Sequence, residues 1–114
     1  MISQKEHDEA TARGEERMRT QPRAIKAAFD AARNLIVIDF NKGYSIAFPP
    51  QRVQILASAT VDQLSQIEID FPGFSIYFPS LDEGMQVSSM LSGRFGNDRW
   101  EAAWAAAHSS EQAA

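Results

Sequence analysis

Cysteine is absent from this chain of 114 residues, and histidine occurs only twice. Without cysteine the chain has no disulfide, no thiolate metal ligand and no cysteine nucleophile. His7 and His108 stand near opposite ends of the sequence, and no neighbouring residues complete the set of converging ligands that a metal site needs. We therefore expect no metal, no cofactor and no cysteine chemistry.

Long hydrophobic runs are also missing. No apolar stretch approaches the roughly 18 residues that a membrane helix requires. The first ten residues, MISQKEHDEA, are polar and acidic, unlike a secretory signal. The sequence therefore predicts a cytoplasmic protein that does not associate with membranes.

The sequence also has no concentrated cluster of basic residues. The chain carries 11 basic and 15 acidic residues, for a net charge of -4. Its basic residues gather only around positions 13–26, where Glu15 and Glu16 dilute them. Duplex nucleic acid is a dense line of negative charge and usually requires a basic patch. We do not expect this chain alone to bind nucleic acid, and a DNA-binding regulator that acts with a partner is kept as an alternative.

The residues that are present divide the chain into three segments. Residues 1–22 form a polar lead-in, 23–97 an α+β core domain, and 98–114 a helix with a polar tail. Ser3 and Glu6 have the spacing of a capping box, which predicts a helix from about Gln4. Because its apolar side is poor, this segment is expected to fray or to await a partner, with Arg13 and Arg17 as candidate contacts.

Alternating apolar residues predict strands in the core domain. In the first strand Ile25, Ala27 and Phe29 are expected to face inward. The nearly continuous apolar run Leu35–Phe40 is typical of a central strand. The predicted fold class is α+β, with a small antiparallel sheet of about five strands, short helices and a C-terminal helix. The five strands lie near residues 25–30, 35–40, 44–48, 67–71 and 74–78.

The first hairpin loop can be chosen by register. A two-residue loop at Lys42-Gly43 would place Asp39 opposite Ile46, on the apolar face. A three-residue loop instead places Ile38 opposite Ile46, so that the apolar faces coincide. That loop needs a left-handed residue at Gly43, which is therefore a structural glycine.

The second hairpin turns at Pro72-Gly73. A two-residue loop there aligns the two apolar faces and places Ile67, Ile69 and Phe71 inward. Pro followed by Gly favours a type II turn, which fits strand twist poorly, so we expect a splayed hairpin.

Two adjacent carboxylates, Asp82 and Glu83, follow the last predicted strand. An enzyme using them is one interpretation, but neighbours in sequence usually point apart on a helix. Ser80 and Glu83 have capping-box spacing, which favours a structural role at the start of a helix. That helix should end at Gly93, which suits a C-terminal stop.

Trp100 and Trp104 stand four residues apart, so on a helix they share one face. The alanines between and after them are too small to form a core. We expect Trp100 to dock on the domain's own sheet. Trp104, nearer the tail, is the stronger candidate for contact with a partner, because exposed aromatic residues mark interfaces.

The stretch from about Arg23 to Trp100 resembles a bacterial family known as domain of unknown function 2442. The likeness is carried by three runs: LIVIDFNKGYSIAFP, LASATVDQLSQIEI and FSIYFPSLDEGMQVSSMLSGRFG. The chain departs from the pattern at Gly84, where the family often has an aspartate. The resemblance implies a small α+β domain with an antiparallel sheet, and it implies no enzymatic activity. It also implies that such proteins are often encoded beside another small protein, in an arrangement resembling toxin-antitoxin pairs.

These observations favour a non-enzymatic protein-interaction module, in the form of an antitoxin-like or regulatory member of a two-gene pair. The expected partner is another protein or a second copy of the chain. Trp104, Trp100, Arg13 and Arg17 are the predicted partner-binding residues. Gly43, Ser80, Glu83 and Gly93 are the predicted structural ones.

Overall fold

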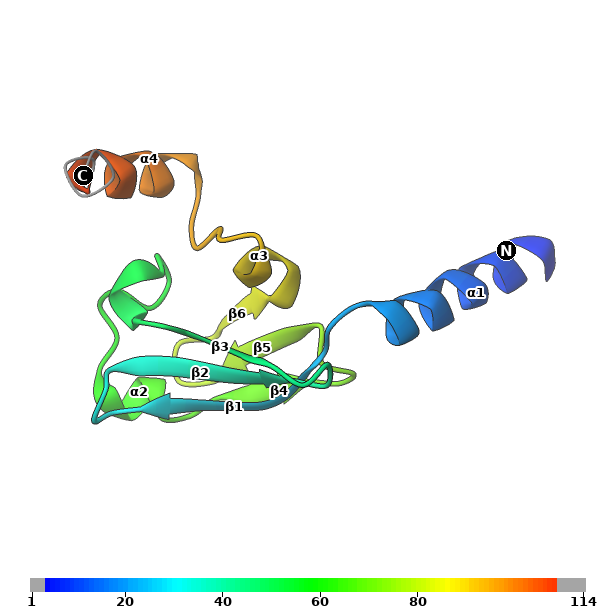
Figure 1. Cartoon of the computed structure of the whole chain (residues 1–114), viewed down its shortest axis with the longest axis horizontal. Coiled ribbons are helices and arrows are strands. Elements are labelled where there is room, and N and C mark those ends of the chain that lie inside the picture. The colour runs from blue at the N-terminus through cyan, green and yellow to red at the C-terminus, as the bar shows by residue number, and fades with distance from the viewer. Residues whose placement is uncertain (1–3, 109–114) are drawn as a thin grey trace.

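The computed structural model of the chain describes residues 4–108. It contains two small antiparallel sheets, short connecting helices, and one longer helix at each end (Figure 1). One sheet has the order β1-β2-β3 and the other β4-β5-β6. The strands are β1 (Ala24–Asp30), β2 (Leu35–Phe40), β3 (Ser45–Phe48), β4 (Glu68–Asp70), β5 (Ser75–Phe78) and β6 (Glu83–Gln86). The helices are α1 (Gln4–Thr20), η1 (Pro50–Arg52), α2 (Val61–Leu64), α3 (Val87–Leu91) and α4 (Asp98–Ala107). The α+β class is confirmed, and the strands form two sheets where one was expected.

A single hydrophobic core lies between the two sheets. The central strand of each sheet contributes most to this core, because alternate residues of β2 and β5 are buried. Residues of the short helices and of the connecting segments complete the core. The buried apolar residues are Ala24, Ile36, Ile38, Phe40, Phe48, Val53, Leu56, Leu64, Ile76, Phe78, Met85, Val87 and Met90.

The first hairpin has the predicted register. Ile38 pairs with Ile46, and Ile36 pairs with Phe48. Gly43 has φ 88°, the left-handed conformation that the three-residue loop requires. The loop is closed by the Phe40 N–H, which donates to the Tyr44 carbonyl at 2.9 Å.

The first strand contains an irregularity that overturns one predicted core position. The pairing of β1 with β2 shifts between Ala24 and Lys26. This bulge turns Ala24 into the core and leaves Ile25 63% exposed. Ala27 and Phe29, beyond the bulge, pack against the core as predicted.

The second hairpin keeps the predicted register, since Ile69 pairs with Ile76, but its turn differs. The Phe71–Pro72 peptide is cis, and Phe71 is 94% exposed, so its predicted inward position is wrong. Gly73 has φ 116° and approaches β1 so closely that a side chain would collide with Ala24. Here the Ala24 N–H donates to the Gly73 carbonyl at 2.7 Å, which joins the two sheets.

The predicted capping box at Ser80 and Glu83 is wrong. Glu83 is the first residue of β6 and pairs with Phe78, because the chain turns back into a third strand. The Ser80 hydroxyl donates to the side-chain oxygen of Gln66 at 3.0 Å. The helix begins later, at Val87, and Gly93 follows its end with φ 80°, as predicted.

The flanking helices extend to opposite ends of the molecule, which measures 54 × 32 × 30 Å (Figure 1). α1 is continuous through Gly14. The expected cap at Ser3 lies outside the described residues. α4 begins after Asn97, whose side-chain oxygen accepts from the Trp100 N–H at 2.8 Å. Asp98 and Glu101 occupy its first turn, where acidic residues favour the positive end of the helix dipole.

Candidate partner-binding surface

Two contacts join the C-terminal end of α1 to the body. The guanidinium carbon of Arg17 lies 3.9 Å from the centre of the Phe74 ring, within cation–π range. The Lys42 ammonium group donates to the Arg19 carbonyl at 3.0 Å, where a cation complements the negative end of the helix. The predicted partner residue Arg17 is therefore partly engaged within the chain, while Arg13 is exposed on the same helix.

An open groove of about 750 Å³ lies between the C-terminal half of α1 and the turn that carries Phe74. We call it the α1 groove. Its apolar surfaces come from Met18, Pro72 and Phe74, and Gly14 leaves space on the helix side. The full lining is Thr11, Gly14, Glu15, Arg17, Met18, Arg19, Pro72 and Phe74.

A second hollow of about 390 Å³ shares Arg17 and Phe74 with the α1 groove. It continues along α3, where Leu91 is 39% exposed beside the buried Val87. The two hollows form one apolar surface that passes from α1 over Phe74 to α3. Exposed apolar area of this kind marks interaction sites on small proteins.

At the other end of the molecule, Arg52 fixes α4 to the body. Its guanidinium donates two hydrogen bonds to Glu101, at 2.8 and 2.6 Å. Both side chains are largely shielded from solvent, with 19% and 23% exposed. These hydrogen bonds lower the pKa of Glu101 and raise the pKa of Arg52. Bidentate pairing of this kind is directional and strong.

The two tryptophans pack around the same arginine. The Trp100 indole N–H donates to the Arg52 carbonyl at 3.0 Å, and the ring lies where a side chain on Gly96 would collide. The Trp104 ring centre is 4.9 Å from the Arg52 guanidinium carbon, and the ring stacks on His108 at 4.2 Å. Both tryptophans are half-buried. Trp100 docks on its own domain, but at η1 and the 94–96 segment and not on the sheet as predicted. A partner role for Trp104 stays a prediction.

The predicted partner residues therefore lie on two separate surfaces. Arg13 and Arg17 are on α1, whereas Trp100 and Trp104 are on α4 at the opposite end (Figure 1). The sequence did not single out Arg52, which contacts α4, or Phe74, which contacts α1. No sequence motif links either residue to the residue that it contacts. Arg52, for example, lies 49 positions from Glu101.

Asp82 and Glu83 are exposed, Asp82 on a turn and Glu83 at the start of β6. Asp82 has φ 50° and accepts a hydrogen bond from the Tyr77 hydroxyl. This bond raises the pKa of Tyr77, because ionisation would remove the proton that the phenol donates to Asp82. Neither carboxylate lines the α1 groove or the hollow beside α3.

The described part of the chain holds no cluster of His, Cys, Asp and Glu that could bind a metal ion. Within residues 4–108, none of the helices combines the length and apolar character needed to span a membrane.

Comparison with known proteins identifies a family. A model of the family described as protein of unknown function DUF2442 matches residues 24–96. The match covers more than half of the chain, so the chain belongs to this family. Among curated proteins, no relative matches the chain.

Two solved structures are similar. A protein of unknown function from Rhodospirillum rubrum is 33% identical with a TM-score of 0.68, and the match covers 71% of this chain and 98% of that one. An uncharacterised protein from Chromobacterium violaceum is 28% identical with the same TM-score of 0.68, covering 90% and 94%. The second match is wider than the family region and extends into both flanking segments.

Proposed function

We propose that this member of the DUF2442 family is a non-enzymatic, cytoplasmic protein-interaction module that binds a helix of a protein partner in the α1 groove. The observation that carries the proposal is the groove itself, an open apolar space between α1 and Phe74. α1 is largely polar, and a polar helix of this length is marginal in water unless something packs against it.

The groove favours an amphipathic helix as the bound element. Its floor is apolar, so a partner helix would insert large apolar side chains at i, i+3 and i+4 spacing toward Phe74 and Met18. Glu15 and Arg19 stand at the rim with opposite charges. A partner helix with charges of both signs beside its apolar stripe would complement them.

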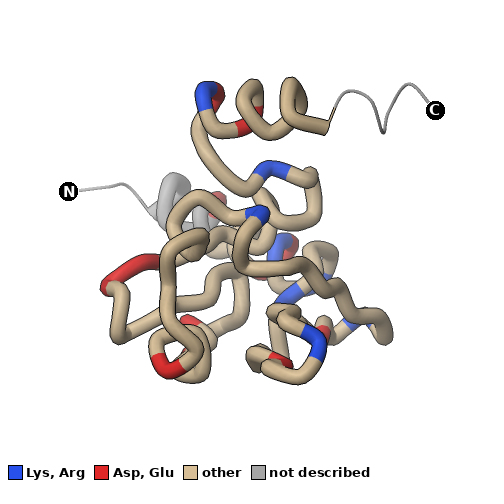
Figure 2. Tube along the Cα trace, turned by 90° about the vertical axis from the view of Figure 1, so that its left-hand side faces the viewer, with Lys and Arg blue, Asp and Glu red and all other residues tan. Residues whose placement is uncertain are grey.

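Two alternatives have less support. Among the residues coloured in Figure 2, acidic and basic positions are interspersed and offer no continuous basic stripe for DNA. An enzyme using Asp82 or Glu83 would need a cleft that converges on them. The antitoxin-like role in a two-gene pair is a narrower form of the same proposal, in which the partner is the product of the adjacent gene.

The proposal is tested by light scattering coupled to gel filtration, on the chain alone and mixed with the product of the adjacent gene. Met18→Glu places a charge in the groove, and Ala12→Glu adds the same charge on α1 outside the groove lining. We expect a complex that Met18→Glu weakens about 30-fold or more, because burial of methionine is worth about 2 kcal/mol. Ala12→Glu should bind like the unmodified chain. Equal binding by the two variants, or a chain that stays monomeric in both experiments, would contradict the proposal.

A further inference from the structure

Strand edges differ in how well they are protected. Unpaired edges invite pairing with other chains, and proteins usually guard them with proline, lysine, bulges or covering segments. β1 has a bulge and Lys26, and its edge lies against β4. β3 runs directly into Pro49-Pro50. The outer edge of β6 has no proline, no lysine and no bulge.

The direction of the β6 backbone groups follows from its pairing with β5. The Val87 N–H donates to the Phe74 carbonyl at 2.9 Å, and the pairs Met85–Ile76 and Glu83–Phe78 continue the same register. In an antiparallel ladder, hydrogen-bonded pairs alternate with pairs whose groups point away. The N–H groups of Gly84 and Gln86 therefore point away from β5. Outside the ladder, neither donates to another backbone group among the described residues.

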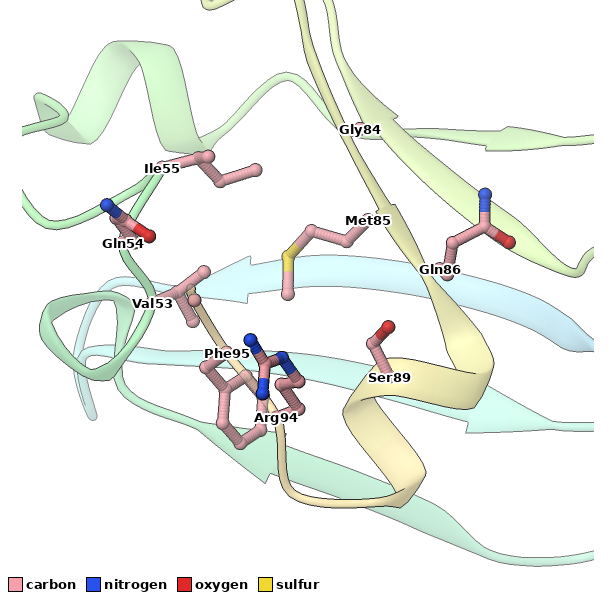
Figure 3. A pocket seen from close by; sticks show the side chains of 10 residues that line it. Val53, Gln54, Ile55, Gly84, Met85, Gln86, Ser89, Arg94 and Phe95 are labelled. Atoms are coloured by element: carbon pink, nitrogen blue, oxygen red, sulfur yellow. The ribbon is translucent and has the colours of Figure 1, made fainter. Parts of the chain in front are cut away.

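These groups border a cleft of about 260 Å³. β6 forms one wall, and the segments 53–55 and 94–96 form the other (Figure 3). The Met85 side chain points into the space between the walls, toward Val53 and Phe95 (Figure 3). The second wall is held in place by the Gln54 N–H, which donates to the Phe95 carbonyl at 2.9 Å.

The two walls of the cleft limit the kind of partner segment that can bind beside β6. The 53–55 and 94–96 segments face the β6 edge and confine the space beside it, and a single extended chain is narrower than a second sheet. Arg94 adds a charge preference, because its side chain lines the cleft and is about half exposed. Its present partner, Asp98, is 96% exposed, so this ion pair is weak and easily exchanged.

We propose that the β6 edge binds an extended, acidic peptide segment of a partner protein by strand addition. The peptide backbone pairs with Gly84 and Gln86, an apolar side chain faces Met85 and Phe95, and a carboxylate pairs with Arg94. Main-chain hydrogen bonds then supply affinity while alternate side chains supply specificity. This site is separate from the α1 groove and does not depend on it.

The test uses NMR titration of the ¹⁵N-labelled chain with two probe peptides, acetyl-Glu-Val-Thr-Val-Thr-amide and acetyl-Thr-Val-Thr-Val-Glu-amide, which cover both strand directions. We expect shifts centred on the amides of Gly84, Gln86 and Arg94 for at least one probe. Gly84→Pro removes an outward N–H without touching the ladder, and it should weaken binding about tenfold, as expected for one lost hydrogen bond.

Ala47→Pro is the matched control, because Ala47 occupies the equivalent outward position on the edge of β3. It should bind the probe like the unmodified chain. A third measurement leaves the protein unchanged and uses two N-methylated forms of the probe that binds. One form is methylated at the odd-numbered residues of the peptide and the other at the even-numbered residues. Because alternate N–H groups of an extended peptide point to opposite sides, only the form methylated on the side that faces β6 should lose binding. The proposal is overturned if the two proline variants bind alike, if both methylated isomers bind alike, or if neither probe shifts the β6 amides.

Discussion

The two flanking helices are attached to the body in different ways. α4 is held by a shielded bidentate ion pair, by a tryptophan hydrogen bond and by a packed ring at Gly96. α1 is held at one end by a cation–π contact and one lysine hydrogen bond, and it leaves an open groove beside it. The helix with the aromatic residues is thus bound to its own domain. The polar helix, α1, is the one beside an open surface that a partner could contact.

The largest expected effect comes from releasing α4. Arg52→Ala removes both hydrogen bonds to Glu101 and the contact with Trp104, and we expect it to cost about 2–3 kcal/mol of unfolding free energy. Both tryptophans of the chain lie on α4, so their fluorescence should shift to the red as they become hydrated. Chemical denaturation with fluorescence detection measures both effects. Arg99→Ala, at an exposed position on the same helix, should change stability by less than about 0.5 kcal/mol.

Acid should loosen α4. The hydrogen bonds from Arg52 lower the pKa of Glu101 in the folded chain. Their stabilising contribution is therefore complete above the ordinary glutamate pKa and is lost as the pH falls through the lowered value. Tryptophan fluorescence followed during acid titration should show this step. Glu101→Gln should abolish the step, and a step that persists in that variant would assign it to another group.

A smaller effect is expected from Gly14→Ala on α1. A side chain at this position meets nothing within 4 Å, so alanine should raise helix stability by about 0.5–1 kcal/mol. Because α1 has little contact with the core, circular dichroism should show more helix while the global unfolding midpoint stays unchanged. A midpoint that rises with the helical signal would mean that α1 folds together with the body, and the contrast with α4 would be lost.

The sequence correctly predicted features that depend on residues close together in the chain. The Gly43 loop, the pairing of Ile38 with Ile46 and the stop at Gly93 follow from residues a few positions apart. The capping box on α2 has an equally local cause, because Thr60 and Gln63 stand three positions apart.

The errors arose where distant parts of the chain decide the outcome. Ser80 and Glu83 have cap spacing, but pairing with β5 draws Glu83 into a strand. A bulge that the alternation pattern does not reveal moves Ile25 outward. The same limit applies to the candidate surface, because the contacts of Arg17 with Phe74 and of Arg52 with Glu101 join segments that only the fold brings together.

The contrast between the flanking helices is tested most directly by amide hydrogen exchange on the free chain. The amides of residues 11–20 and 98–107 are compared in one sample, so that solution conditions are identical. The account predicts that α4 amides beyond the first turn exchange slowly, with opening coupled to the Arg52–Glu101 pair. It predicts that α1 amides exchange nearly as fast as those of an unstructured peptide. Equal protection of both helices in the free chain would contradict the central claim that α1 is the helix left available for a partner.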